Sequence, residues 1–236
     1  MTEKTIGIIG GMGPEATLDL YREIIRATPA QRDQDHLRVI IDSNPKIPDR
    51  TPAIIGDGEN PVSAMVMSCR LLERAGADFC IIPCISAHYF IEELRAQINL
   101  PILSAFDAVC THITDHHPNI RTIGLLSTSG TVQGGRFALR LAEGGIATIL
   151  PEPDVQKRIM DAIYRIKASQ DPVERAKSKA ILISAAEHVI NRGAQGIIAG
   201  CTEIPLELKP RDLAQPLFNP LEILARAAVD RATDRR

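Results

Sequence analysis

The sequence predicts an α/β protein of two similar lobes, each a parallel sheet flanked by helices. Short apolar runs end at Cys84 in ADFCIIPCISAH and at Cys201 in AQGIIAGCTEIP, as buried parallel strands do. A shift of 117 positions (201 − 84 = 117) places Cys84 on Cys201 and Thr5-Ile6-Gly7 on Thr122-Ile123-Gly124. These matches indicate an internal duplication related by a pseudo-twofold axis, so we expect an active site in the cleft between the lobes.

The offset divides the 236 residues into three segments. Residues 1–117 form an N-terminal α/β lobe carrying Cys84, and residues 118–215 form a C-terminal α/β lobe carrying Cys201. We expect residues 216–236 to supply a strand and a helix that pack back on the first lobe. Lobes of this size are long enough to bury a core of their own.

Composition excludes several classes of partner. The net charge is −2 and the pI about 6.3, which argues against binding to nucleic acid or to an anionic membrane surface. Aromatic residues make up 3% and Trp is absent, so base-stacking platforms are not expected. No apolar run has the length of a secretory or membrane-spanning segment. Five cysteines without framework spacing indicate reduced thiols and a cytoplasmic protein.

A glycine-rich turn follows the first predicted strand, Thr5 to Ile9. Gly10-Gly11-Met12-Gly13 forms this turn, and Pro14 suits the first position of the next helix. The spacing predicts an apolar face on that helix, formed by Leu18, Tyr21 and Ile25. GMGPEA also matches the form G-x-G-x-x-A of a dinucleotide fingerprint, with Asp42 as the ribose ligand. We favour a glycine turn that lets the backbone approach a ligand closely.

A proline-rich stretch, residues 43–61, predicts a long ordered loop. It carries Arg50, whose guanidinium is either a solvated loop charge or a clamp for a carboxylate. The same loop is also suited to act as a lid that excludes water.

The five cysteines fall into two groups. Cys69 lies on the buried stripe of a helix over residues 61–76, Cys80 lies inside a strand, and Cys110 lies on the buried face of a helix over residues 105–116. Cys84 differs because it lies just past the carboxyl end of its strand, where open parallel sheets bind ligands. A helix predicted from Ser86 through Leu94 starts beside it and favours the thiolate.

The remaining elements of the two lobes complete the duplicated pattern. A short strand is predicted at Pro101–Leu103, and His112, His116 and His117 near the end of the following helix lack the spacing of a metal site. The second lobe repeats the strand and turn of the first. Its predicted elements are a strand at residues 122–128, a hydroxyl-rich turn with Thr128, Ser129 and Thr131, a strand in ATILP, a helix from Asp154, a helix from Val173 to Asn191, a strand before Cys201, a strand in PLF and a helix from Leu221.

Several polar residues of the second lobe have two interpretations. The hydroxyls of Thr128 and Thr131 either bind an anion or simply cap a helix. Lys167 either complements the dipole at the end of its helix or points into the cleft.

Two facing thiols suit inversion of a carbon centre. One thiolate takes the proton from Cα, while the other thiol gives a proton to the opposite face, and a thiol can be present in either state near neutral pH. The developing charge needs donors placed in advance. The turns around Met12, Ser86, Thr128 and Thr202 are placed to supply them.

The chain resembles the aspartate/glutamate racemase family, and more closely its aspartate racemase branch. The matching pieces span nearly the whole chain: IGIIGGMGPEAT (6–17), NPKIPDRT (44–51), PCISAH (83–88), GLLSTSGT (124–131), IYRIK (163–167) and GCTEIPL (200–206). Glutamate racemases of cell-wall synthesis have GCTHYP at the last site, so Glu203 points to the aspartate branch.

The resemblance implies a cofactor-independent amino-acid racemase, without pyridoxal phosphate or a metal and usually a homodimer. It assigns Cys84 and Cys201 as the acid/base thiols, and Arg50 and Lys167 as ligands of the side-chain carboxylate of an acidic amino acid, most closely aspartate. The substrate-binding residues expected from the turns and the resemblance together are Met12, Arg50, Ile85, Ser86, Thr128, Thr131, Lys167, Thr202 and Glu203.

One position departs from the family. The usual motif is PCNTAH, and Ile85 here replaces an asparagine that helps to hold the substrate. This change keeps open an isomerase or decarboxylase of a non-amino dicarboxylic acid, or a catalytically weak binding protein. A cysteine hydrolase that pairs Cys84 with His88 is a further alternative, but the sequence shows no group to orient His88 and no reason for a second thiol.

Overall fold

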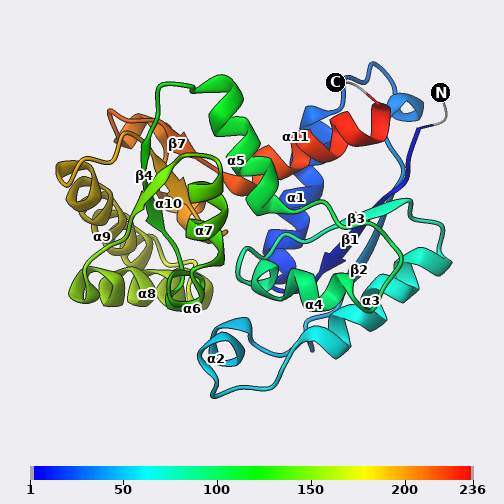
Figure 1. The fold of residues 1–236 in the computed structure, drawn as a ribbon, viewed down its shortest axis with the longest axis horizontal. Coiled ribbons are helices and arrows are strands. Elements are labelled where there is room, and N and C mark those ends of the chain that lie inside the picture. The colour runs from blue at the N-terminus through cyan, green and yellow to red at the C-terminus, as the bar shows by residue number, and fades with distance from the viewer. Residues whose placement is uncertain (1–2, 235–236) are drawn as a thin grey trace. The chain divides into compact units, whose positions relative to one another are not determined.

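A computed structural model describes residues 3–234. The chain divides into two compact units, Met1–Ala108 with Leu221–Arg236 and Val109–Pro220. No described helix combines the length and the apolar character needed to cross a membrane. Each unit is an α/β structure with its own parallel sheet and hydrophobic core, as predicted (Figure 1).

The first unit is built on a sheet of three parallel strands in the order β2-β1-β3. The central strand β1 is buried along its whole length, as its apolar run predicts. A single parallel bridge from Cys80 to Ile102 stands where a fourth strand was expected. The elements of this part of the chain are β1 (Ile6–Gly10), α1 (Pro14–Ala27), η1 (Asp33–Asp35), β2 (Val39–Ser43), α2 (Arg50–Ile55), α3 (Val62–Arg74), β3 (Phe79–Ile81), η2 (Ser86–Phe90) and α4 (Ile91–Arg95). Helix α5 (Ala105–His116) begins in the first unit and continues into the second.

The second unit has a sheet of four parallel strands in the order β5-β4-β6-β7. The first three positions repeat the order of the first sheet, with the first strand in the centre and the second and third on either side, as the internal duplication leads one to expect. The elements are β4 (Thr122–Leu126), α6 (Ser129–Gly134), α7 (Arg136–Glu143), β5 (Ala147–Ile149), α8 (Pro153–Ala168), α9 (Pro172–Asn191), β6 (Ile197–Ala199), α10 (Ile204–Glu207), η3 (Pro210–Asp212) and β7 (Leu217–Phe218). The last helix, α11 (Pro220–Thr233), begins where the second unit ends.

The segment 216–236 is divided between the two units. Strand β7 pairs with β6 in the second sheet, whereas α11 belongs to the first unit almost entirely. There the backbone N–H of Lys4 donates to the carbonyl of Ala232 at 3.0 Å, and the guanidinium of Arg231 lies 4.9 Å from the ring centre of Phe79. Helix α11, red in Figure 1, lies beside α1, and side chains of both helices line one shallow surface cavity.

The buried face of α1 differs from the expected one. Leu18, Tyr21 and Ile25 are 50%, 37% and 40% exposed, so the prediction that they face the core was wrong. The helix instead buries an adjacent stripe that contains Thr17. The Thr17 hydroxyl accepts from the N–H of Gly11 at 2.9 Å and donates to the carbonyl of Gly13 at 3.0 Å. These bonds attach this face of α1 to the glycine turn.

The proline-rich stretch 43–61 also differs from the expected loop. It contains the short helix α2, which begins at Arg50. The Asp49 carboxylate caps this helix by accepting from the N–H of Thr51 at 3.1 Å, and Gly56 ends it with a positive φ of 98°. Local capping therefore forms a helix too short to give an apolar periodicity in the sequence.

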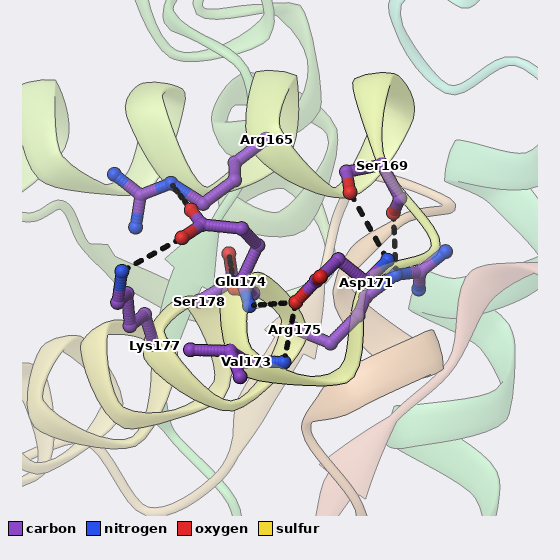
Figure 2. Close-up of polar contacts among 8 residues, drawn as sticks. All are labelled: Arg165, Ser169, Asp171, Val173, Glu174, Arg175, Lys177 and Ser178. Carbon is purple, nitrogen blue, oxygen red and sulfur yellow. Dashed lines mark hydrogen bonds and ion pairs between the residues drawn. The ribbon is translucent and has the colours of Figure 1, made fainter.

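A polar corner joins α8 to α9 in the second unit (Figure 2). The Asp171 carboxylate caps α9 by accepting from the N–H groups of Val173 and Glu174 at 2.7 and 3.2 Å. Arg175 donates through Nε to the carbonyl of Ser169 at 3.0 Å and through NH1 to the Glu207 carboxylate at 2.7 Å. Arg175 therefore ties this corner to α10, the helix that directly follows Cys201 and Glu203.

Candidate active site

Cys84 lies just past β3 in the first unit, where the carboxyl ends of β1 and β3 lie side by side. Its residue is 9% exposed, and it shares a core cluster with Met12 of the glycine turn. Ser86 begins the 3-10 helix η2, so the expected α-helix starts here as a tighter turn. We call this group of residues the Cys84 edge.

The glycine turn of the Cys84 edge is closely packed against backbone. A Cβ added to Gly11, which has a φ of +88°, would lie 2.3 Å from the carbonyl carbon of Asn44. The N–H of Asn44 donates to the carbonyl of Gly10 at 3.3 Å. Gly11 therefore allows a close approach of the turn to the chain after β2. Asp42 lies in β2, opposite Ile9 of β1.

His88 supports the Cys84 edge from inside the core. Its ring is fully buried, and the Nδ1–H donates to the carbonyl of Cys84 at 3.0 Å. Nε2 has no hydrogen-bond partner among the described residues. Burial lowers the pKa of His88 to about 4, so the ring is neutral at physiological pH. Because the ring binds the carbonyl of Cys84, this geometry does not support a cysteine–histidine hydrolase.

The buried ring predicts a pH dependence of stability. The folded state holds the pKa of His88 near 4, below its ordinary 6.5, so the unfolded state binds more protons between these values. His88 therefore stabilises the fold fully above pH 6.5, and roughly 3 kcal/mol of that stability is lost as the pH falls towards 4. His88→Asn keeps a donor without a titrating ring. We expect it to remove this part of the pH dependence in urea unfolding at pH 7, 5 and 4.

The matched control is His116→Asn, because His116 is an exposed residue near the end of α5. This variant should lose stability on acidification as the unsubstituted protein does. A pH dependence that is equal for His88→Asn and the unsubstituted protein would contradict the assignment of a buried neutral ring.

Arg50 is half-buried at the start of α2. NH1 donates to the carbonyls of Ile47 and Pro48 at 3.2 and 2.6 Å, which fixes the guanidinium. Its Nε is buried and has no hydrogen-bond partner among the described residues. A fixed guanidinium with an unused donor is suited to an anionic ligand such as a carboxylate.

Cys201 lies just past β6 in the second unit, at the point that corresponds to Cys84. The Ser127 hydroxyl after β4 donates to the carbonyl of Gly200 at 2.5 Å, which joins the ends of the two strands. Gln156 of α8 donates to the carbonyl of Ser127 at 2.9 Å. Thr128 caps α6, its hydroxyl accepting from the N–H of Thr131 at 3.3 Å. We call this group of residues the Cys201 edge.

A carboxylate lies against the second thiol. The Sγ–H of Cys201 donates to Oε2 of Glu203 at 2.9 Å, and the Thr202 hydroxyl donates to the same oxygen at 3.2 Å. Nζ of Lys167, in the last turn of α8, lies 3.8 Å from the other oxygen of Glu203. The structure therefore places four of the predicted residues in one contact network at the Cys201 edge.

The other cysteines are buried, as predicted. Cys69, Cys80 and Cys110 are at most 2% exposed. The hydrogen bond of the Cys80 thiol with Cys69, together with burial, raises the pKa of Cys80 well above its usual range. The described residues contain no cluster of His, Cys, Asp and Glu suited to a metal ion, and His112 stacks on His116 with ring centres 4.5 Å apart.

Two supporting residues were not predicted from the sequence. Ser127 and Gln156 fix the Cys201 edge through backbone carbonyls. The sequence gives only a weak signal for the role of Gln156, because it is an amide residue next to the core position Val155 in an amphipathic helix. Ser127 belongs to the hydroxyl-rich stretch STSGT, in which the sequence gives no means to separate its role from those of its neighbours.

Two parallel α/β units with the same central strand order, each with a cysteine just past its third strand, define a protein of the racemase class of folds. Residues 9–228 match the family described as Asp/Glu/Hydantoin racemase, and the chain belongs to this family.

Relatives of known name agree with this membership. The broad specificity amino-acid racemase RacX of Bacillus subtilis is 25% identical over 231 residues, 95% of this chain and 96% of the relative. The structure of Picrophilus torridus aspartate racemase is similar with a TM-score of 0.84 and 28% identity, over 98% of this chain and 94% of that one. An aspartate racemase homologue from Pyrococcus horikoshii gives a TM-score of 0.79 and 25% identity, over 98% and 99%.

Proposed function

We propose that the protein is a cofactor-independent racemase of acidic amino acids, with aspartate as the preferred substrate. The observation that carries the proposal is the pair of cysteines, each just past the third strand of its sheet in a chain of the Asp/Glu/Hydantoin racemase family. The same chemical group at two corresponding positions suits a reaction whose forward and reverse directions are chemically alike.

In the proposed reaction, one cysteine is a thiolate and the other a thiol. The thiolate removes the proton from Cα and becomes a thiol, and the electron pair of the C–H bond delocalises into the α-carboxylate. The second thiol then donates its proton to the opposite face of Cα and becomes a thiolate. No proton is gained or lost overall, and the two cysteines have exchanged roles.

Polar groups of both edges supply the remaining functions. We assign stabilisation of the charge on the α-carboxylate to donors around Met12, Ser86, Thr128, Thr131 and Thr202. We assign the side-chain carboxylate of the substrate to Arg50, whose buried Nε is unused, and to Lys167. The ammonium group of Lys167 lies near Glu203 and can interact with that carboxylate and with the carboxylate of a ligand. A homodimer is also part of the proposal, from the resemblance to aspartate racemases.

Ile85 bears on the range of substrates. It is buried at the start of η2 and offers no side-chain hydrogen bond where the family motif has an asparagine. A lost amide contact typically costs about 1–3 kcal/mol when its partner stays buried. The relative from Bacillus subtilis is named a broad specificity racemase, so a panel of amino acids is the appropriate first assay.

The test is proton NMR in D2O with the purified protein and L-aspartate, with L-glutamate and other amino acids in parallel. We expect loss of the Cα–H signal together with formation of the D-enantiomer, fastest for aspartate. The protein carrying both Cys84→Ala and Cys201→Ala is the control and should leave every spectrum unchanged. If no amino acid exchanges its Cα proton, the proposal is wrong.

Ile85 favours one second candidate, an isomerase or decarboxylase of a non-amino dicarboxylic acid. Such a substrate has no ammonium group for the missing asparagine to help hold. Turnover of maleate or a substituted malonate, with aspartate left unchanged, would support this candidate over the racemase.

A further inference from the structure

The two thiols differ in their charged neighbours. Cys201 donates to the Glu203 carboxylate at 2.9 Å. Among the described residues, Cys84 makes no such contact with a carboxylate, and the neutral ring of His88 binds only its carbonyl. The two sheets have the same central strand order, but the charged groups next to the two thiols differ.

The contact between Cys201 and Glu203 favours one protonation state. A carboxyl group is a much stronger acid than a thiol, so in a pair of the two the proton stays on sulfur at neutral pH. Loss of that proton would place a thiolate beside a carboxylate and remove the hydrogen bond between them. Both effects favour the thiol form of Cys201.

The burial of Glu203 strengthens this effect. Its side chain is 14% exposed, which limits screening by water, whereas Lys167 is 43% exposed. The ammonium group of Lys167 lies beside the oxygen of Glu203 that does not accept from Cys201, and it offsets part of the negative charge of this carboxylate. It therefore acts on Cys201 in the direction opposite to Glu203, and more weakly.

We propose that Glu203 is a positioning residue that holds the proton on Cys201, so that Cys201 rests as the acid and Cys84 provides the base. The catalytic part of this inference rests on the proposed function, whereas the effect of Glu203 on the thiol does not. Glu203 is accordingly assigned here to Cys201 rather than to direct contact with the substrate. The resting enzyme is then ready for the enantiomer whose Cα–H faces Cys84.

The experiment measures alkylation of each cysteine by iodoacetamide between pH 6 and 10, with peptides quantified by mass spectrometry. In the unsubstituted protein, the pH at which alkylation of Cys201 reaches half of its maximal rate gives the reference midpoint. Glu203→Gln keeps the size of the side chain and removes its charge, so it should lower the midpoint for Cys201 by about 1 pH unit. Lys167→Met should raise that midpoint by roughly 0.5 pH unit.

Glu207→Gln is the matched control, because Glu207 lies four positions on (207 − 203 = 4) and pairs with Arg175 at 2.7 Å. It should leave the midpoint for Cys201 unchanged. Cys69, Cys80 and Cys110 report folding within the same samples, since they become reactive only when the core opens. If Glu203→Gln does not fold, the opposite shift in Lys167→Met still tests the proposal.

The outcomes separate this inference from the proposed function. Opposite shifts in the two variants support the carboxylate as the group that holds the proton, even if no amino acid exchanges its Cα–H. Racemisation with an unchanged midpoint for Cys201 in both variants overturns this inference and leaves the proposed function in place.

Discussion

Replacing either Cys84 or Cys201 by alanine is expected to lower kcat/KM for racemisation by at least about 10³-fold. General acid or base catalysis by one positioned group typically contributes 10²–10⁴-fold, and inversion at Cα needs both groups in every turnover. Each variant retains one of the two proposed catalytic thiols, which can still exchange the Cα proton of the enantiomer that faces it. Chiral chromatography measures the racemisation, and NMR in D2O measures the exchange for each enantiomer.

The prediction is specific because each thiol faces the Cα proton of a different enantiomer. Exchange in Cys84→Ala and in Cys201→Ala should be confined to opposite enantiomers. Cys110→Ala is the control, because Cys110 is buried beside Gly144 and Arg140 and should keep full activity. A fully active Cys84→Ala or Cys201→Ala variant would rule out the mechanism with two bases.

Gly11→Ala is expected to lower the free energy of unfolding by about 4 kcal/mol. The φ of +88° alone costs an L-residue about 1–2 kcal/mol. The added Cβ would in addition lie 2.3–2.5 Å from backbone atoms of Asn44, and relieving that overlap costs roughly 1–3 kcal/mol. Urea unfolding at neutral pH measures the difference.

Gly76→Ala separates the two contributions to this cost. Gly76 has a similar φ of +92°, and a Cβ there would meet no atom within 4 Å. Gly76→Ala should therefore lose only the conformational part, about 1–2 kcal/mol. Equal losses in the two variants would show that the contact between Gly11 and Asn44 contributes nothing.

The predicted features that agree with the structure are those with a local signal. The strand before Cys84 and the strand before Cys201 are short apolar runs, and each is buried along its whole length. The stripe of α8, from Val155 to Ile166, is buried as its helical period predicts. The match at an offset of 117 residues in the sequence has its counterpart in the shared strand order of the two sheets.

The features that disagree depend on hydrogen bonds and caps that the pattern of apolar residues does not contain. Leu18, Tyr21 and Ile25 form a regular apolar stripe, but bonds of Thr17 to the glycine turn bury the adjacent face of α1. Helix α2 is too short for a period to appear in the sequence. A pattern of apolar residues shows that a helix has a buried side, but it does not show which neighbour covers it.

From the residues alone we could therefore predict the α/β class, the duplicated pattern and the point in each half at which a cysteine follows a buried strand. These follow from side-chain periodicity and from matching residues, which are properties of short segments. The folded structure was needed to show that His88 binds the carbonyl of Cys84, that Gly11 packs against Asn44 and that Lys167 lies beside Glu203. The first contact depends on the tight turn of η2, and the other two depend on how separate segments pack against one another, so no pattern of apolar residues encodes them.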